Sequence, residues 1–395
     1  MRTLEDLDLA GKRVFLRADL NVPLDGGRIG DATRIEATLP TIRHILARGG
    51  RPIVASHLGR PKGAPRPELS LRPVADFLRT ALGVPVELAP DCVGAATETL
   101  VRGMGGGQVV VLENLRFHPE EEQNDPVFAR ALAALADVYV DDAFGAAHRA
   151  HASTAGMAVH FKDKAAGLLL RREVEFLSRL LHAPEAPFVA VLGGAKVSDK
   201  IGVLQNLLDR VQAFCIGGAM AYTFLRAQGK PAGRSRIEAD KVDVAAETLA
   251  RAAKCGVRIV LPLDHLAADR PEAGARTAIV PADAFPDDLL GVDIGPDTAA
   301  LYGKQIAAGR TVFWNGPMGI FEIDAFSRGT MTVAAALAAS TGTTVVGGGD
   351  SVAALRRAGK LDAVTHVSTG GGASLEFLEG RQLPGLTALE AGAGR

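Results

Sequence analysis

Residues 343–351 read Thr-Thr-Val-Val-Gly-Gly-Gly-Asp-Ser, a β-branched run that leads directly into three glycines, an acid and a hydroxyl. Glycine has no side chain, so the backbone N–H groups of such a turn can approach a polyanion closely. Residues 351–358 predict a helix whose positive dipole end points at the same place. Because an acid beside a phosphate site is typical of a bound divalent cation, we interpret this stretch as part of a nucleotide site.

The same strand-to-glycine unit recurs three more times in the second half of the chain, at 188–194, 213–218 and 364–372. A single turn of this kind is an ordinary connection between a strand and a helix. Four of them within one half of the chain indicate a nucleotide site.

Two lysines follow the glycines at 193 and 194. Lys196 and Lys200 are four residues apart, about one helical turn, which would let both ammonium groups face one nucleotide. A solvated pair is the ordinary alternative, and the preceding glycines favour phosphate contact. The loop is not a Walker A motif. No G-x-G-x-x-G follows the first strand with an acid about 20 residues later, which weakens a dehydrogenase interpretation.

The composition is that of a globular protein with two or three domains: 395 residues, 47% hydrophobic and 23% charged. Lys plus Arg is 44 against 45 Asp plus Glu, so the net field does not favour nucleic acid and any anion site must be local. The three cysteines, Cys92, Cys215 and Cys255, are far apart and form no C-x-x-C. Their spacing argues against zinc and against a disulfide framework, and it fits a reducing compartment, the cytoplasm.

The sequence predicts neither a signal peptide at its start nor a membrane-spanning helix further along. The first residues carry acids where a signal peptide needs an apolar core. No residue between Arg328 and Asp350 is charged, but this stretch is rich in Ala, Thr, Ser and Gly rather than Leu and Ile. We therefore expect a buried helix at about 330–339 followed by a buried strand.

Short apolar runs alternate with helical patterns along the whole chain. Runs that are apolar on both faces are typical of parallel strands covered by helices on both sides. The predicted strands are 13–17, 52–55, 109–112, 138–140, 188–192, 214–216, 257–261, 311–314, 343–346 and 364–367. The pattern predicts an α/β protein with two doubly wound, Rossmann-like parallel sheets. We place the domain boundary near 165–187, where an amphipathic helix at 168–181 precedes a Pro-containing segment.

The first half of the chain carries arginines after its predicted strands. In open parallel sheets, ligands bind beyond the carboxyl ends of the strands. The basic residues at or near this edge are Arg17, Arg34, Arg60, Arg116 and Arg149. One such arginine alone would be read as a surface salt bridge, but all five at one edge indicate a pocket for a small, multiply anionic molecule. We expect His118 and His160 to be structural rather than catalytic.

Two anion sites on two domains indicate phosphoryl transfer, in which the protein mainly positions reactants and neutralises charge. The sequence contains no Gly-x-Ser-x-Gly motif and no arrangement typical of an activated nucleophile, so direct in-line transfer is the simpler mechanism. Glu322 is a candidate hydrogen-bond acceptor for a ribose. We interpret Trp314, the single tryptophan, as a core residue.

Eight motifs in order resemble those of phosphoglycerate kinase over essentially the whole chain. They lie at 17–23, 56–61, 112–118, 142–151, 193–200, 314–319, 347–351 and 368–376. The resemblance implies reversible transfer of a phosphoryl group between 1,3-bisphosphoglycerate and Mg-ADP, which gives 3-phosphoglycerate and Mg-ATP in glycolysis and gluconeogenesis. It also implies Mg²⁺ as cofactor, and no nucleic-acid or membrane partner.

The resemblance implies a role for each matching position. The substrate site would comprise Asp19, Asn21, Arg34, His57, Leu58, Gly59, Arg60, Arg116 and Arg149. The nucleotide site would comprise Gly193, Lys196, Lys200, Gly217, Gly218, Gly291, Asn315, Pro317, Glu322, Gly348, Gly349, Asp350 and Ser351. Arg34, Lys196, Gly348 and Gly371 would be catalytic, Asp350 would bind the metal, and Lys196 with Arg34 would hold the phosphoryl group in flight.

The family's architecture is a two-lobed monomer whose C-terminus returns to the first lobe. The resemblance thus implies a triose-phosphate domain at 1–170 completed by 374–395, and a nucleotide domain at 171–373 that includes a helical hinge. Closure of the hinge would expel water and align the reactants. Departures from the family pattern are Asp141 in place of Asn, Ala146 in place of Thr, and Ser351 in place of Thr. We expect the first two to tune the hinge region without loss of activity.

Two other functions remain open at this point. A binding protein that uses both sites without turnover would bind ADP but form no ATP; the presence of Arg34, Lys196 and Asp350 argues against it. A sugar-phosphate dehydrogenase would require a nicotinamide fingerprint, which the sequence lacks.

Overall fold

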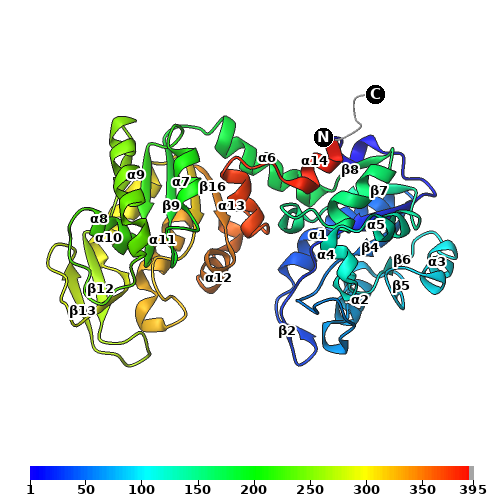
Figure 1. Cartoon of the computed structure of the whole chain (residues 1–395), viewed down its shortest axis with the longest axis horizontal. Coiled ribbons are helices and arrows are strands. Elements are labelled where there is room, and N and C mark those ends of the chain that lie inside the picture. The colour runs from blue at the N-terminus through cyan, green and yellow to red at the C-terminus, as the bar shows by residue number, and fades with distance from the viewer. Residues whose placement is uncertain (391–395) are drawn as a thin grey trace. The chain divides into compact units, whose positions relative to one another are not determined.

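The computed structural model describes residues 1–390, and its contacts divide the chain into two compact units. Unit 1 comprises Met1–Glu175 together with the segment that starts at Gln382, and unit 2 comprises Phe176–Arg381. Figure 1 colours the chain from blue to red along this path. Among the 390 described residues, no helix is both long and apolar enough to cross a membrane.

Unit 1 is built on a six-stranded parallel sheet with the order β5-β6-β4-β1-β7-β8. The strands of this sheet are β1 (Arg13–Arg17), β4 (Arg51–Ala55), β5 (Val86–Leu88), β6 (Val109–Val111), β7 (Val138–Asp141) and β8 (Lys164–Ala166). Its helices are α1 (Thr33–Ala47), α2 (Arg72–Leu82), α3 (Ala95–Arg102), α4 (Pro119–Gln123), α5 (Pro126–Ala133) and α14 (Pro384–Glu390). A short hairpin, β2 (Leu24–Asp25) with β3 (Arg28–Ile29), precedes α1.

The central strands of unit 1 are buried because helices cover their apolar side chains. Val14 and Leu16 of β1, Val54 of β4 and Val140 of β7 belong to one core cluster with residues of α1 and α2. At about 25 cal/mol per Å² of buried apolar surface, such runs are stable only when both faces of the sheet are covered. This is why the strands read as unbroken apolar runs in the sequence.

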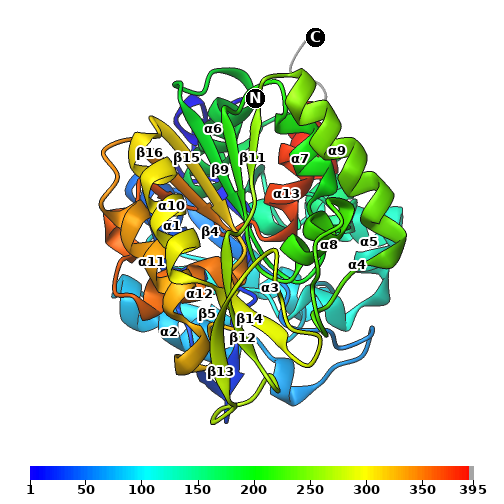
Figure 2. The same ribbon diagram turned by 90° about the vertical axis from the view of Figure 1, so that its left-hand side faces the viewer.

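Unit 2 repeats the architecture with the strand order β11-β10-β9-β15-β16-β17. Its parallel strands are β9 (Phe188–Leu192), β10 (Ala213–Ile216), β11 (Arg258–Val260), β15 (Thr311–Asn315), β16 (Thr343–Gly347) and β17 (His366–Val367). Its helices are α7 (Ile201–Leu207), α8 (Met220–Ala227), α9 (Val242–Lys254), α10 (Pro296–Ala308), α11 (Arg328–Ala338), α12 (Gly349–Arg357) and α13 (Gly372–Leu378). In Figure 2, α10 and α11 lie on one side of this sheet, and α7 and α9 lie on the other.

The tryptophan is a core residue, as predicted. Trp314 of β15 is fully buried in a cluster with Tyr302 of α10 and Val333 of α11, and its indole Nε1 donates to the Gly316 carbonyl over 2.8 Å. The doubly wound α/β prediction is confirmed in both units, and all ten predicted strands are present with shifts of a residue or two at their ends.

The sequence pattern did not predict the antiparallel sheet of unit 2, which has the strand order β13-β12-β14. Its strands are β12 (Asp264–Ala268), β13 (Thr277–Pro281) and β14 (Leu290–Ile294). β13 has four exposed residues out of five, so it lacks the apolar run that marks a buried parallel strand. The short strands β5 and β8 of unit 1 were also missed.

The helix α6 (Leu168–His182) contains the boundary between the units and matches the predicted helix closely. Its first amides are capped by Asp142, whose Oδ1 accepts from Leu169 and Leu170 over 2.9 and 3.1 Å. The returning C-terminal segment begins at Gln382, later than the expected Ser374. The difference arises because α13 packs on α7, where the Asn206 side-chain amide donates to the Leu378 carbonyl over 2.7 Å.

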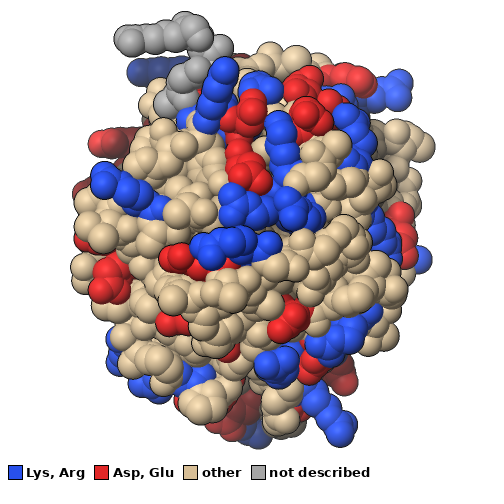
Figure 3. All heavy atoms as spheres, turned by 90° about the vertical axis from the view of Figure 1, so that its right-hand side faces the viewer, with Lys and Arg blue, Asp and Glu red and all other residues tan. Residues whose placement is uncertain are grey.

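Charges are mixed on the described surface. On the face shown in Figure 3, Lys and Arg side chains are interspersed with Asp and Glu. This distribution agrees with a formal net charge of −1 and with the expectation that anion sites are local.

Candidate active site

The sheet of unit 1 brings the predicted substrate residues to one edge. Arg17, the last residue of β1, pairs in register with Ala55 of β4 and Asp141 of β7. The segments that follow these strands therefore start side by side at the carboxyl edge of the sheet. They carry Asp19, Asn21 and His57.

Arg34 in the first turn of α1 is held by the segment after β1. Its Nη1 donates to both carboxylate oxygens of Asp19 over 3.0 and 3.1 Å, and to the Asn21 carbonyl over 3.2 Å. The Asn21 side-chain oxygen accepts from the Gly59 amide over 2.9 Å, which links this group to the segment after β4. About a third of the Arg34 side chain remains exposed, so the guanidinium is oriented but accessible.

Arg116 is positioned by Asn114 and Gly59. The Asn114 side chain caps the short 3₁₀ helix η3 (Leu115–Phe117): its oxygen accepts from the amides of Leu58 and Arg116 over 3.2 and 3.1 Å. Arg116 Nη1 donates to the Gly59 carbonyl over 3.0 Å. Gly59 has φ +63°, a conformation that favours glycine, and a Cβ there would lie 2.8 Å from the end of the Leu69 side chain, which would have to move.

A buried polar network lies beneath these residues and was not predicted as a unit. Arg17 is 1% exposed; its Nη2 lies 3.2 Å from His57 Nδ1, and its Nε donates to Ser153 Oγ over 2.7 Å. Ser153 Oγ in turn donates to Glu121 over 2.5 Å. Because an arginine can only donate, Nδ1 of neutral His57 is an acceptor and the proton resides on Nε2.

Burial and neighbouring arginines lower the pKa values of two histidines at this edge. Burial lowers the pKa of His57 well below its usual range, and the charges of Arg17, Arg116 and Arg34 lower it further. Burial also lowers the pKa of His151 to about 3, again with contributions from arginines. Both histidines are therefore neutral at physiological pH, which avoids adding positive charge to a crowded site.

The remaining predicted arginines are on the outside of this group. Arg149 is exposed, donates from Nε to His148 over 3.1 Å, and adds its charge to those acting on His151 and Arg116. Arg60 is also exposed. Ser153, Glu121 and His151 were not predicted as site residues. The signal for His151 in the sequence was its place at the end of one of the eight motifs.

In unit 2 the glycine turns are packed backbone against backbone. A Cβ on Gly193 would lie 2.1 Å from the Pro317 carbonyl oxygen, and one on Gly316 would lie 2.2 Å from the Gly193 oxygen. The amides of Gly193, Gly194, Gly217 and Gly218 donate to backbone carbonyls over 2.8–3.0 Å. This differs from the expectation that such amides face a polyanion: these glycines permit close packing of neighbouring strand ends.

The N-terminus of α12 presents backbone amides that are unpaired within the helix, as expected for an anion site. Gly348 precedes this helix with φ +90°, and α12 begins at Gly349, so its first amides have no acceptor within the helix. Asp350 lies in this first turn and is exposed, whereas Ser351 is buried and its Oγ accepts from the Gly316 amide over 2.6 Å. Gly371 similarly precedes α13 with φ +55°.

The two lysines differ in environment. Lys200 is 8% exposed, and burial lowers its pKa to about 8 against the opposing charges of Asp199 and Asp350. Lys196 is exposed. The prediction that they share a helical turn is wrong, because α7 begins only at Ile201 and the preceding loop is held by Glu238, which accepts from the Ser198 hydroxyl over 2.7 Å.

A cavity of about 520 Å³ lies beside these turns. Its lining includes the predicted residues Gly218, Gly291, Pro317, Glu322 and Asp350. The predicted residues Gly193, Lys196, Lys200, Gly217, Asn315, Gly348, Gly349 and Ser351 are not among those that line it.

The antiparallel sheet of unit 2, which was not predicted, supplies part of the cavity wall. His265 of β12 and Asp293 of β14 line the cavity together with Tyr222 of α8. The Tyr222 hydroxyl lies 2.9 Å from His265 Nδ1, and a Cβ on Gly291 would lie 1.5 Å from that hydroxyl. Gly291 is therefore the residue that leaves room for the Tyr222 ring.

A family model described as phosphoglycerate kinase matches residues 4–381. The chain belongs to the phosphoglycerate kinase family. It is 58% identical over 393 residues to a phosphoglycerate kinase of Anaeromyxobacter sp. (strain K), with 99% of each chain covered. It is 55% identical over 387 residues to that of Moorella thermoacetica, with 98% of each covered.

Solved structures of the same family have the same fold. The structure of phosphoglycerate kinase from Coxiella burnetii matches with a TM-score of 0.89 at 43% identity, covering 98% of both chains. That from Pyrococcus horikoshii OT3 matches with a TM-score of 0.86 at 33% identity, covering 99% of this chain and 98% of the other. The chain is thus a phosphotransferase with a carboxyl group as acceptor, and its reaction is the glycolytic phosphoryl transfer of phosphoglycerate kinases.

Proposed function

We propose that unit 1 binds 3-phosphoglycerate or 1,3-bisphosphoglycerate through its basic edge, and that unit 2 binds ADP or ATP with Mg²⁺ at the cavity and the start of α12. The observation that carries this proposal is the electrostatic environment of His57, where three arginines act on one buried, neutral imidazole. Arg34 pairs with Asp19 and Arg116 with Glu122, and a multiply charged anion would compensate the positive charge that remains at this edge.

Each group in unit 1 has a chemically suitable role. His57 Nε2–H donates a hydrogen bond to the anion, because Arg17 occupies Nδ1. Arg116 and Arg34 offer bidentate donors for phosphate or carboxylate oxygens, with Arg60 and Arg149 at the outside, while the Leu58–Gly59 backbone shapes the site. Asp19 and Asn21 bind the substrate hydroxyl in addition to holding Arg34.

In unit 2 the nucleotide phosphates interact with the first amides of α12 and with Lys200. Gly348 and Gly371 border the phosphates, and Glu322 accepts a hydrogen bond from the ribose. Asp350 fits Mg²⁺, since this ion is commonly bound by one or two carboxylates together with substrate phosphate oxygens. The ion neutralises charge on the phosphates when bound. The remaining predicted nucleotide residues shape the turns between these groups.

The reaction is a direct in-line transfer. A β-phosphate oxygen of ADP attacks the phosphorus of the acyl phosphate, the bond between that phosphorus and the carboxyl oxygen breaks, and the carboxylate of 3-phosphoglycerate leaves. Arg34 and Lys196 neutralise the charge on the phosphoryl group during transfer. No protein nucleophile is required.

An ATP-forming assay with 1,3-bisphosphoglycerate and ADP, run with and without Mg²⁺, tests the proposal. We expect rapid ATP formation with Mg²⁺ and its near loss when the ion is chelated. Binding of ADP with no ATP formation would instead support a binding protein, and an Asp350→Asn variant with unchanged Mg²⁺ dependence would reject Asp350 as metal ligand.

We further propose that the protein acts as a cytoplasmic monomer. Three cysteines without the spacing of a disulfide framework support a reducing compartment. Light scattering at micromolar concentration should give a mass close to 41.1 kDa, and a value near twice that would contradict the monomer.

A further inference from the structure

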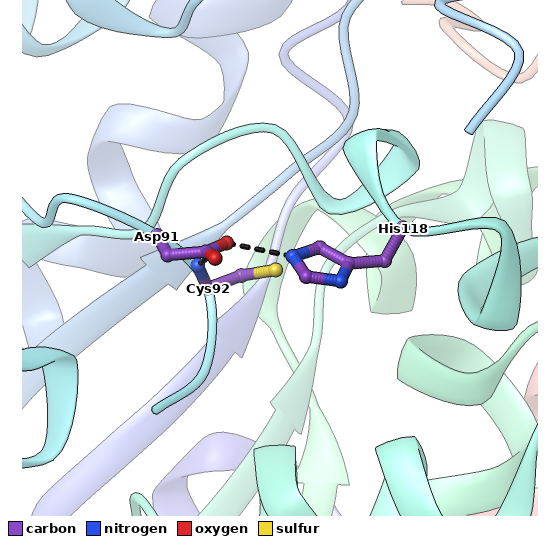
Figure 4. A group of neighbouring side chains, drawn as sticks. All are labelled: Asp91, Cys92 and His118. Carbon is purple, nitrogen blue, oxygen red and sulfur yellow. Dashed lines mark hydrogen bonds and ion pairs between the residues drawn. The ribbon is translucent and has the colours of Figure 1, made fainter. Parts of the chain in front are cut away.

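A second cluster of ligand-type side chains lies in unit 1, outside the basic edge. Asp91 and Cys92 follow β5, and His118 follows η3. One potential ligand atom from each of the three residues lies within 4.8 Å of the other two. Figure 4 shows the Cys92 sulfur and the Asp91 carboxylate next to the same edge of the His118 ring.

The imidazole is fixed in this position by two contacts. His118 Nε2 lies 2.7 Å from Asp91 Oδ1, and its ring stacks on Phe128 with a centroid distance of 5.1 Å and an interplanar angle of 27°. The Cys92 amide donates to the same carboxylate oxygen over 2.6 Å, which orients the Asp91 side chain. The ring stacking on Phe128 and the amide of Cys92 thus hold the His118 and Asp91 side chains in place around the Cys92 sulfur.

The cluster is open to solvent on one side. Asp91 and His118 line a cavity of about 580 Å³ together with Arg66, Phe117 and other residues. Cys92 is fully buried, whereas the side chains of Asp91 and His118 are 46% and 27% exposed. A cation placed among the three ligand atoms would therefore have a water-accessible fourth position.

We propose that Asp91, Cys92 and His118 form a binding site for a divalent transition metal of the Zn²⁺ class. A thiolate, an imidazole nitrogen and a carboxylate oxygen are the ligands that zinc accepts, and three protein ligands plus a water complete a tetrahedral site. Bonds of about 2.0–2.3 Å place tetrahedral ligands roughly 3.3–3.8 Å apart, so only a small opening of the Asp91–His118 contact is needed.

Metal binding changes where the protons of Cys92 and His118 are. The Cys92 thiol loses its proton to solvent and binds as thiolate. His118 binds through Nε2 and carries its proton on Nδ1, which ends its hydrogen bond to Asp91 and frees the carboxylate for the metal. The thiolate and carboxylate together neutralise the two charges of the ion.

The spacing of cysteines along the sequence gave no sign of a zinc site, because the three side chains of this cluster meet only through the pairing of two strands. β5 and β6 are neighbouring parallel strands, with Val86 opposite Val109. The segments after them consequently emerge side by side, and they bring a single cysteine next to a histidine that is far away in sequence. Hard Mg²⁺ prefers oxygen ligands and would not compete well for this sulfur and nitrogen set.

Co²⁺ titration of the full-length protein tests the proposal, because Co²⁺ reports thiolate ligation spectroscopically. The exposed Cys255 is first replaced in a Cys255→Ser background, so that it cannot supply a thiolate. We expect near-ultraviolet thiolate-to-cobalt absorption and intense visible bands of tetrahedral Co²⁺ that saturate at one equivalent. Addition of Zn²⁺ should displace the Co²⁺ and remove both sets of bands.

The single variants separate the three ligands. Cys92→Ser should abolish the thiolate band, and His118→Gln should weaken Zn²⁺ binding at least tenfold. Asp91→Asn should weaken Zn²⁺ binding but retain the thiolate band. Cys215→Ser, which removes a buried thiol in unit 2, should leave the titration unchanged.

Three results would overturn the site. These are Co²⁺ binding without a thiolate band, a band that survives Cys92→Ser in protein whose circular dichroism is unchanged, and Zn²⁺ affinity unaffected by Asp91→Asn and His118→Gln together. If Cys92→Ser does not fold, Asp91→Asn and His118→Gln still decide the question, because both of these side chains are partly exposed.

Discussion

The Arg17 guanidinium lies 3.2 Å from His57 Nδ1, and both side chains are buried at the carboxyl edge of the unit 1 sheet. Arg17 also donates to Ser153 Oγ and to the Ala18 carbonyl. Its planar fork thus satisfies several acceptors at once, and it fixes the proton of neutral His57 on Nε2.

Arg17→Lys should therefore impair substrate use although it keeps the charge. An ammonium cannot reach Ser153, His57 and the Ala18 carbonyl together, so we expect kcat/KM for 3-phosphoglycerate to fall about 10–100-fold. Steady-state kinetics with varied 3-phosphoglycerate measure this, and ADP affinity serves as control. An unchanged kcat/KM would show that the His57 tautomer does not matter for binding.

Arg34→Ala should lower turnover far more than it weakens nucleotide binding. The residue is held by Asp19 of its own unit, and its proposed role is in the transfer step. We expect a loss of kcat of two or more orders of magnitude. Equal losses of kcat and of ADP affinity, the latter measured by calorimetry, would count against this role.

Asp141→Asn should stabilise the protein at neutral pH. Burial raises the pKa of Asp141 to about 6, and its Oδ2 has no hydrogen-bond partner among the described residues. A carboxyl whose pKa is raised in the folded state contributes fully to stability at a pH below its pKa in the unfolded state, about 3.9. That contribution is lost as the pH rises through the folded-state pKa of about 6. Removing the ionisable group should thus add roughly 1–3 kcal/mol at pH 7.

The benefit of Asp141→Asn should disappear near pH 4. Urea unfolding of both proteins across this range measures the difference, with Asp297→Asn as an accessible aspartate control. A difference that does not depend on pH would indicate a packing effect instead of ionisation.

Nucleotide affinity should fall as pH rises through about 8. Burial lowers the pKa of Lys200 to about 8, so its ammonium is lost above this pH and with it a phosphate contact. Bound phosphate favours the charged form, so the midpoint with ADP should lie somewhat higher. Lys200→Arg keeps the charge and should flatten the ADP affinity profile between pH 7 and 9.5. A steep fall that persists in Lys200→Arg would assign the effect to another group.

Gly291→Ala should close the cavity of unit 2. The added Cβ would lie 1.5 Å from the Tyr222 hydroxyl, so the ring must move. We expect ADP affinity to fall at least tenfold and the free energy of unfolding to fall by about 1–3 kcal/mol. Gly303→Ala, where a Cβ in α10 meets no atom within 4 Å, is the matched control and should be neutral or slightly stabilising. Full ADP affinity in Gly291→Ala would separate this cavity from nucleotide binding.

The parallel strands were predictable because their signal is local. Strands such as Phe188–Leu192 and Arg13–Arg17 are apolar on both faces, and turn residues follow them directly. The strand β13 gave no such signal, since four of its five residues are exposed and its partners are β12 and β14. His265 lies on β12, which is mostly buried but pairs antiparallel with β13 and β14. The sequence pattern of parallel strands did not reveal this pairing or the cavity wall that it forms.

The lysine loop shows a second limit of the sequence. Lys196 and Lys200 have helical spacing, but Glu238, about forty positions later, holds the loop between them in a non-helical conformation. A spacing argument assumes the secondary structure that a distant side chain decides here.

The amino-acid sequence alone determined the α/β architecture, the order of the motifs and the residue types at each strand end, because these depend on local periodicity and on where strands stop. Only the tertiary structure decided which groups share a dielectric environment: the neutral, buried His57 beneath three arginines, the lowered pKa of Lys200, and the meeting of Cys92 with His118. Burial and long-range pairing set these properties, and neither is encoded in the spacing of residues along the chain.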